Sequence, residues 1–320
     1  LFLNELGGGT LRGNPGKNYR IFTGSTTGSL CVFEDLVGIS VLGPGCTLTV
    51  DLTPVITISK GYLFLFDNCK NIKIDGWTTN GPTLDISATT VKGWEFSHFF
   101  YGCRNIDMPC NRVVNALAGA IFQNQSGDLT PTSTARCRNV HIGVLECTNV
   151  WHGVNCQSSG DGMVIDRLKT DTVHRSMNID GGMESVRANI WGKDPKAIDV
   201  FVSTGSVGGA LRDIEINYHA GADSTACGEG ERIGLYFGSS TPGRMTNIHF
   251  HMDIQFAGSG TTGSAAFRLF KRSDPDGTED TAVRGHEIDG LKLTGVVKGM
   301  PSSSGLGFVT GTSLTGVWGA

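Results

Sequence analysis

The sequence predicts an all-β protein, built as one solenoid of stacked parallel strands. Three observations support this fold class: short segments of alternating apolar and polar residues recur along the chain, 46 of 320 residues are glycine, and only 18% are charged. Alternation with a period of two is the pattern of a half-buried strand. Abundant glycine with little charge is typical of many tight turns and argues against a disordered chain or a long helical array.

The first strand of each repeat begins at an Asn, or at the residue that replaces it, and continues with alternating apolar residues. We expect the Asn in a turn, where its side chain bonds the matching Asn of the next coil. The segments are NIKIDGW (71–77), NIDMPCN (105–111), NVHIGVL (139–145), GMVIDRL (162–168), SVRANIW (185–191), DIEINYH (213–219), NIHFHMD (247–253) and GLKLTGV (290–296).

A second short strand follows within each repeat. The segments are AIFQNQ (120–125), GVNCQ (153–157), SMNID (176–180), AIDVF (197–201), GLYFG (234–238), AFRLF (266–270) and GLGFV (305–309). Antiparallel hairpins would need turn signals such as Asn-Gly between neighbouring strands, and these are scarce here. Like strands are therefore expected to stack in parallel, one whole repeat apart, with loops inserted at 222–231 and 259–266.

The opening LNELGGGTLRGNPGKNYRIF resembles the first coil of pectate-lyase-like right-handed β-helix proteins, in which a short capping helix precedes the first strand. The pairing of N-[IV]-x-[IV] with a downstream G-[IVL]-x-[ILVC] strand is similar to the rungs of polygalacturonases and phage tailspike depolymerases. The resemblance implies a right-handed parallel β-helix of about 8–10 coils, with a cap and first coil at 1–24 and a single β-helix domain at 25–320. The polygalacturonase signatures N-T-D-G and G-D-D are replaced by VWHGVN and VHRSMN, so ordinary polygalacturonase activity is not expected.

Composition excludes several partners. A net charge of −4 gives no reason to expect binding to nucleic acid or to an anionic membrane surface. No apolar stretch reaches the ~20 residues that span a bilayer, and because the chain opens at Leu1 we expect a processed or trimmed fragment.

The nine cysteines are an odd number and show no zinc-binding spacing, so no metal is expected at them. Cys69, Cys103 and Cys137 each open a C-[KR]-N-[IV] segment, 34 residues apart. This regular spacing predicts reduced thiols stacked inside the fold, and a few disulfides in a secreted protein are the alternative.

The second strands carry the predicted functional face. Because a solenoid fills its interior with apolar side chains, function is expected on an outward strand face. The proposed alignment places Val154, Met177, Ile198, Leu235 and Phe267 inward. The outward row then contains Asn155, Asn178, Asp199, Tyr236 and Arg268, and the next outward row contains Gln157, Asp180 and Phe201. We expect a groove that binds a sugar chain, although an ordinary polar strand face would give a similar pattern.

Upstream of these strands lie Trp151, His152, His174, Arg175, Asp194 and Lys196. Trp151 is expected to stack on a sugar ring through its apolar face. His152 and His174 are aligned one coil apart, where a histidine can act as a general base or hydrogen-bond donor. Exposed turn residues would be the simpler interpretation.

Hydrolysis of a glycosidic bond requires two carboxyl groups. The alignment puts Asp180 and Asp199 about 8 Å apart from the ~4.8 Å rung spacing and the pleat, within the broad range of inverting enzymes. These two are the predicted acid and base, in either order, and Glu184 is the reserve carboxylate.

Elimination is the alternative chemistry. Arg175, with His174 or Lys196, would supply a base and a cation for a uronate, and a lyase of this kind could use calcium. The outward row of the first strands is the rival face, and we interpret it as solvated or as a contact with a neighbouring chain. It contains Lys73, Asp107, His141, Arg187, Glu215, His249 and Lys292.

Three function classes therefore remain. The first is a tailspike-type depolymerase that cleaves a bacterial surface polysaccharide as a homotrimer on a virion tail, as the resemblance implies. The second is a secreted polysaccharide lyase or hydrolase that acts as a monomer. The third is a glycan-binding β-helix adhesin without catalysis.

Overall fold

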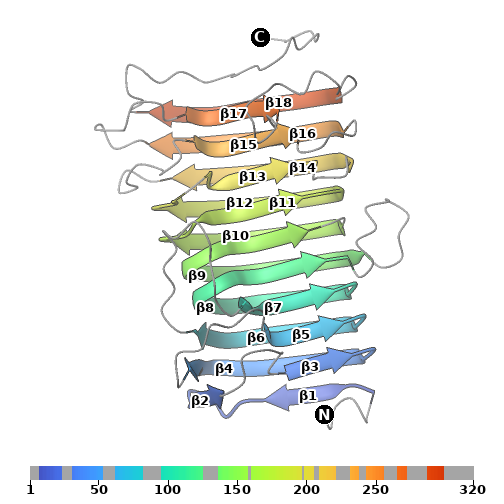
Figure 1. Ribbon diagram of the computed structural model, residues 1–320, viewed down its shortest axis with the longest axis vertical. Coiled ribbons are helices and arrows are strands. Elements are labelled where there is room, and N and C mark those ends of the chain that lie inside the picture. Colours follow the sequence, from blue (N-terminus) through green and yellow to red (C-terminus); the bar gives the residue numbers. More distant parts are fainter. Residues whose placement is uncertain are drawn as a thin grey trace.

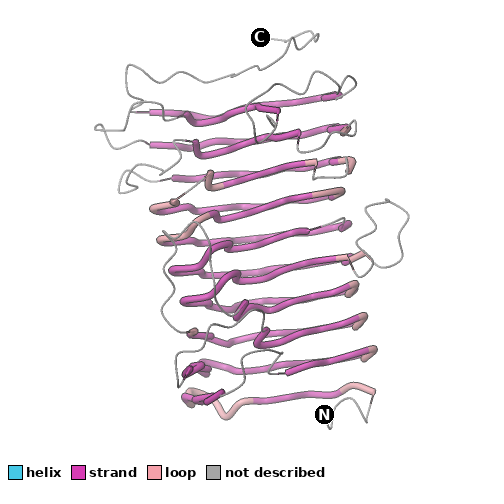
Figure 2. Tube along the Cα trace, viewed as in Figure 1, coloured by secondary structure: helices cyan, strands magenta, loops and turns pink. Residues whose placement is uncertain are grey.

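The computed structural model shows an all-β protein, as the sequence predicts. It describes residues 7–23, 31–52, 62–81, 95–124, 136–157, 160–196, 198–204, 209–220, 231–237, 243–255, 265–271 and 287–298. These residues form strands joined by short bends, and none of them is helical (Figure 2). The expected capping helix, the loop insertions and the strand at 305–309 fall mainly or wholly outside the described residues.

Eighteen strands stack along the long axis of the molecule, from β1 at one end to β18 at the other (Figure 1). Their bounds are β1 Gly9–Arg12, β2 Asn18–Thr23, β3 Cys31–Glu34, β4 Val37–Leu52, β5 Tyr62–Asp67, β6 Lys70–Asn80, β7 Glu95–Tyr101, β8 Arg104–Gln123 and β9 Cys137–Gln157. The later strands are β10 Gly160–Asp171, β11 Arg175–Asp180, β12 Met183–Lys193, β13 Val200–Ser203, β14 Leu211–Ala220, β15 Glu231–Phe237, β16 Arg244–Gln255, β17 Ala265–Lys271 and β18 Glu287–Lys298.

Every pairing between the described strands is parallel, and most strands pair with the strand two places along the chain. One ladder runs through β4, β6, β8, β9, β10, β12, β14, β16 and β18. A second ladder runs through β3, β5, β7, the ends of β8 and β9, β11, β13, β15 and β17. The two ladders correspond to the two series of strands that the sequence repeats predict.

The register of the first ladder is confirmed position by position. Asp107 pairs with Lys73 and His141, and Glu215 pairs with Arg187 and His249. The residues at the repeated Asn position have positive φ. They are Asn71, Asn105, Asn139, Gly162, Ser185, Asp213, Asn247 and Gly290. Asn and Gly tolerate this left-handed conformation best, which explains why they recur there.

The predicted ladder of Asn side chains is present at these turns. Asn105 donates from Nδ2 to Oδ1 of Asn71 at 2.8 Å, and Asn139 donates to Asn105 at 2.9 Å. Asn247 donates to the carboxylate of Asp213 at 2.9 Å. Side-chain hydrogen bonds therefore tie together the turns that carry Asn or Asp on both neighbouring rungs.

Stacked apolar side chains fill the interior. Phe33, Phe66, Phe100 and Phe122 lie on successive rungs, with ring centroids 4.8 to 5.2 Å apart. Buried Cys103 donates its thiol to the carbonyl of Phe66, and Cys137 donates to that of Phe100. The eight cysteines in the described part of the chain are free thiols, in agreement with the predicted stacking of reduced cysteines.

The predicted register of the second ladder is correct for two rungs and then fails by two residues. Val154 pairs with Met177, as expected, but Met177 pairs with Val200 and not with Ile198. A shift of two residues preserves the alternation of inward and outward side chains, so the apolar pattern alone does not detect it. The turn before β13 is longer than the alignment assumed, so Phe201 takes the outward position predicted for Asp199. Val200 then pairs with Ile233 and not with Leu235, whereas Phe267 lies in the row expected for it, opposite Ile233.

Candidate functional site

The outer face of the second ladder presents two continuous rows of side chains. With the observed register, the first row contains Val32, Leu65, Phe99, Ile121, Asn155, Asn178 and Phe201, and the backbone register continues through Gly234 and Arg268. The second row contains Glu34, Asp67, Tyr101, Gln123, Gln157, Asp180, Ser203 and Tyr236. We call this surface the ladder-two face.

The first rungs of the ladder-two face form an apolar cluster outside the main core. Phe99 and Ile121 are 6% and 4% exposed although they point away from the interior, and they pack with Ala118. Tyr62 lies against Phe99, with ring centroids 4.2 Å apart. Apolar and aromatic side chains on an outward face are a feature of surfaces that bind ligands.

The apolar rows change to amides at β9 and β11. Asn155 and Asn178 are 4% and 6% exposed, and Nδ2 of Asn178 donates to Oδ1 of Asn155 at 2.9 Å. Gln157 is exposed one pleat further along. The predicted alignment of these three residues is confirmed, and together they place hydrogen-bonding groups along the middle of the face.

A stacked pair of rings borders the amides. Trp151 lies on His174 with ring centroids 3.6 Å apart and an angle of 8° between the planes. Loss of hydration, together with the nearby charge of Arg175, lowers the pKa of His174 to about 4. His152 pairs with Arg175 and not with His174, so the predicted histidine alignment is wrong by one residue. Burial, with smaller contributions from Arg175 and His174, lowers the pKa of His152 well below its usual value.

Arg175 connects the amides to the next rungs. Its guanidinium donates to Oδ1 of Asn178 at 3.2 Å and lies over the ring of Phe201, 4.5 Å from the centroid. Phe201 in turn contacts Tyr236, with ring centroids 5.5 Å apart. The contacts hold a cation at a fixed place on the face, where it can bind an anionic or hydroxylated ligand.

Asp180 is an exposed residue in the second row, beside this cation. Loss of hydration raises the pKa of the Asp180 carboxyl, while a hydrogen bond from Ser203 and the charge of Arg175 act in the opposite direction. A carboxyl group with a raised pKa keeps its proton to higher pH and is better suited to act as a general acid. Asp180 therefore occupies the position that the sequence predicts for it.

The predicted outward position of Asp199 is wrong. Its side chain is fully buried, and it lies just before β13, where it points into the interior. Oδ1 accepts hydrogen bonds from the backbone N–H of Ser176, at 2.8 Å, and from the Ser176 hydroxyl, while Oδ2 accepts one from Tyr218. Since Asp199 is enclosed by these partners, the predicted pair of Asp180 and Asp199 does not form.

The neighbouring residues leave room for the buried carboxylate of Asp199 and interact with it. Burial raises the pKa of its carboxyl, which the hydrogen bonds and the charge of buried Arg232 partly offset. A Cβ at Gly192 would lie 2.0 Å from Oδ2 of Asp199, so only glycine leaves room for the carboxylate. We conclude that Asp199 is a structural residue of the interior.

Three further predicted residues lie away from the middle of the face. Glu184 follows the bend after Asp180 and pairs with Asp161 and Arg212 on the first ladder. Lys196 is exposed, and its backbone N–H donates to the carbonyl of Val173 at 2.7 Å. The backbone of Arg268 pairs with Gly234, whereas its side chain lies outside the described residues.

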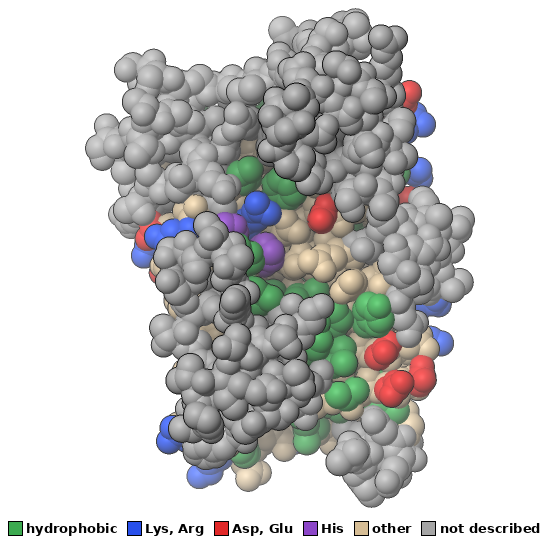
Figure 3. Space-filling view, in the orientation of Figure 1, with side chains coloured by type: hydrophobic (Ala, Val, Ile, Leu, Met, Phe, Trp, Pro, Cys, Tyr) green, Lys and Arg blue, Asp and Glu red, His purple; other side chains and the backbone are tan. Residues whose placement is uncertain are grey.

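A hollow of about 260 Å³ lies on the ladder-two face. Aromatic residues Tyr62, Phe99 and Trp151 line it, with His152 and Asn155 among its polar groups. Figure 3 shows apolar, polar and histidine side chains gathered in the middle of this view of the molecule. The sequence reasoning did not identify Tyr62 or Phe99 as site residues, because the segments YLFLFD and EFSHFFY were not included in the second series of strands.

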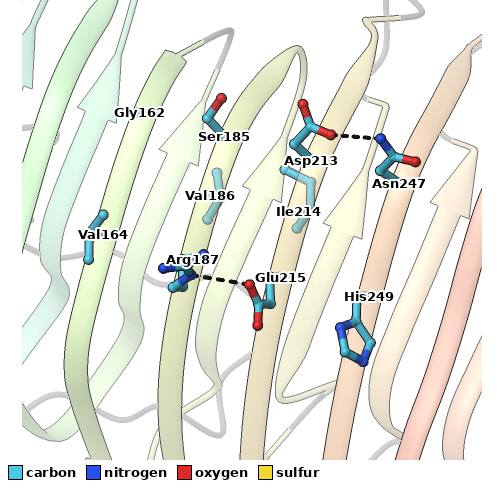
Figure 4. Close-up of a pocket in the computed structure, with 10 residues that line it drawn as sticks. All are labelled: Gly162, Val164, Ser185, Val186, Arg187, Asp213, Ile214, Glu215, Asn247 and His249. Carbon is cyan, nitrogen blue, oxygen red and sulfur yellow. Dashed lines mark hydrogen bonds and ion pairs between the residues drawn. The ribbon is translucent and has the colours of Figure 1, made fainter.

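The rival face on the first ladder carries a larger and shallower hollow of about 540 Å³ (Figure 4). Arg187 and Glu215 form an ion pair of 3.1 Å across it, and His249 lies on the following rung. The charged side chains therefore neutralise one another across neighbouring rungs. This agrees with the interpretation of a solvated face.

Comparison with known proteins identifies no relative. No protein-family model matches the chain, and no curated protein is similar to it. Within the described ranges, no group of three or more His, Cys, Asp and Glu side chains could hold a metal ion. The same residues contain no helix with the length and hydrophobicity needed to cross a membrane.

Proposed function

We propose that this chain is a polysaccharide depolymerase with a right-handed parallel β-helix, of the tailspike type, which acts on a bacterial capsule or O-antigen. The observation that carries the proposal is the ladder-two face. There, outward aromatic, amide, cationic and carboxyl side chains follow one another over successive rungs.

The spacing of the rungs matches an extended polymer. Side chains in one row repeat every ~4.8 Å along the stack, which is about the length of one sugar unit, so successive sugars can meet successive rungs. The rings of Trp151 and Phe201 offer apolar surfaces, and Asn155, Asn178 and Gln157 offer donors and acceptors. Such a combination is suited to a chain with apolar ring faces and hydroxyl edges.

Asp180 is the proposed general acid of the reaction. Its raised pKa has a physical cause in its loss of hydration, and Arg175 and Ser203 fix its surroundings. Since Asp199 is buried, Glu184 is the remaining predicted partner, on the far side of the Gly181–Gly182 bend. Under the proposal Asp180 protonates the leaving oxygen, and Glu184 activates water as the base.

A panel of bacterial capsules, O-antigens and pectic polysaccharides tests the proposal. We expect new reducing ends without an unsaturated, ultraviolet-absorbing product, and a loss of at least about a hundredfold in Asp180→Asn and in Glu184→Gln. Normal turnover in Asp180→Asn would contradict the assignment of the acid. Polymers that bind without being cleaved would instead indicate a glycan-binding adhesin.

A lyase is the second candidate, because the charge of Arg175 acts on Asp180, and His174 precedes Arg175 in the chain. His174 has a lowered pKa and stays neutral, so it can accept a proton, and Arg175 can bind a uronate carboxylate. An ultraviolet-absorbing product that requires His174, Arg175 or Lys196, with or without added calcium, would favour elimination.

The resemblance to tailspikes also leads us to propose a homotrimer on a virion tail, with a secreted monomeric enzyme as the alternative. Neither nucleic acid nor a membrane is a proposed partner. Sedimentation equilibrium separates the two assembly states, since the trimer has three times the mass of the 34.0 kDa chain.

A further inference from the structure

We propose that the hollow beside Trp151 is a subsite for one uncharged sugar unit, a neutral hexose, within the longer groove. This inference rests on the proposed function and specifies the chemistry of one position of the substrate. It follows from the size of the hollow, from the free amide donor of Asn155 in its lining, and from the absence of charge among the described residues that line it.

The size fits a single unit. The hollow has a volume of about 260 Å³, slightly less than the ~300–1,000 Å³ of pockets that enclose drug-sized molecules. His174 covers one face of the Trp151 ring from the following rung, at 3.6 Å between centroids. Ile121 on the preceding rung and Phe99 on the rung before it line the hollow together with Trp151. An apolar sugar face can stack there.

Asn155 presents a donor to the hollow. Its Oδ1 already accepts a hydrogen bond from Asn178 on the following rung, which fixes the direction of the amide. On the preceding rung its neighbour is Ile121, whose side chain cannot accept a hydrogen bond. The Nδ2 group of Asn155 thus has no acceptor among the described residues, and it can donate to a ligand in the hollow.

His152 lines the hollow without adding a charge to it. Its pKa is lowered well below the usual value, first by burial and then by the charges of Arg175 and His174, so the imidazole is neutral. Its Nε2 is enclosed by the protein and forms no hydrogen bond within the described part of the chain. The polar contact of a sugar hydroxyl in the hollow is therefore with Nδ2 of Asn155.

The remaining lining residues explain the preference for an uncharged unit. Tyr62 and Ile121 are aromatic or apolar, and Gln157 has a neutral amide. Among the described residues, no Lys, Arg, Asp or Glu lines this hollow, so a uronate carboxylate would lose its hydration without a cation to bind. Arg175 pairs with His152 from the next rung. An acidic sugar of the substrate would therefore bind beside Arg175, one position along the groove from the hollow.

Saturation-transfer NMR with methyl glucoside, methyl galactoside and methyl glucuronide tests the subsite on the intact protein. We expect transfer to the two neutral glycosides and at least tenfold weaker binding of the glucuronide. Asn155→Leu should weaken the neutral glycosides about fivefold or more, as expected for one lost hydrogen bond of ~1 kcal/mol. The control is Asn189→Leu on the other ladder, where Asn189 likewise accepts a 2.9 Å hydrogen bond from the next rung, from Asn217, but already donates to the carbonyl of Asp166 at 3.1 Å.

Three results would overturn the inference: no transfer to any glycoside, equal binding of the glucuronide, or equal weakening by the two variants. Thermal unfolding of both variants shows whether Asn155→Leu has lost binding through misfolding. If Asn155→Leu is misfolded, the relative affinities of the neutral glycosides and the glucuronide for the unchanged protein still test the proposed subsite. Polysaccharide cleavage without glycoside binding would refute the subsite and leave the proposed function standing.

Discussion

Replacing Asp199 by alanine is expected to destabilise the fold and not to act on catalysis directly. The carboxylate accepts hydrogen bonds from the Ser176 backbone, the Ser176 hydroxyl and Tyr218, and it is fully buried. The variant removes the shared acceptor of these donors and a negative charge near the buried side chain of Arg232. Breaking a buried charged network in this way costs about 3–5 kcal/mol.

Urea denaturation followed by circular dichroism measures this loss, with polysaccharide cleavage assayed on the fraction that remains folded. We expect a large decrease in the unfolding midpoint and near-normal turnover per folded molecule. Asp199→Asn retains the size of the side chain and an acceptor for Ser176, so its loss should be smaller. Asp180→Asn provides the opposite control, since it should cut turnover and leave the midpoint nearly unchanged. An Asp199→Ala protein with normal stability and no activity would refute the structural role.

Three other predictions concern the histidines, the Asn turns and the thiols. Because the pKa of His174 is lowered to about 4 while an unfolded histidine titrates near ~6.5, the unfolded state binds more protons between these pH values. This contribution to stability falls as the pH drops from about 6.5 to about 4, and His174→Gln should reduce the slope of unfolding free energy against pH. The raised pKa values of Asp180 and Asp199 act in the opposite direction at acidic pH. Asn105→Ala loses a 2.8 Å hydrogen bond and retains a positive φ of 56°, so its free energy of unfolding should fall by about 1–3 kcal/mol. Asn105→Gly should lose less stability in calorimetry, because glycine adopts positive φ without strain. Equal losses in the two variants would contradict a contribution from the left-handed backbone conformation. Reductant should leave the melting temperature unchanged, and a marked drop with dithiothreitol would contradict the free-thiol assignment. Cys110→Ser should lower the number of rapidly labelled thiols by one, since Cys110 is exposed and Cys103 is buried.

The first ladder could be predicted from sequence because its repeats carry a marker beyond apolar alternation. The Asn position needs a left-handed conformation, and only a few residue types adopt it well. Asn71, Asn105 and Asn139 therefore define the register without ambiguity, and all their partners in the ladder follow.

The second ladder lacks such a marker, and its register is predicted wrongly at β13 and β15. Ile198 and Val200 are both apolar and both buried, so either fits the inward position opposite Met177. The inward orientation of Asp199 has no local signal either, because its partners Ser176 and Tyr218 come from distant parts of the chain. The outward positions of Asn155, Asn178 and Asp180 were therefore predicted correctly, whereas the outward position of Asp199 was not.

The location of a bound glycan tests the central claim most directly. We would determine a crystal structure with an oligosaccharide released from the polymer that the panel identifies, using Asp180→Asn to prevent turnover. The ladder-two face predicts sugar density along Trp151, Asn155, Asn178 and Phe201. Density confined to the first-ladder face, over Arg187, Glu215 and His249, would contradict the account.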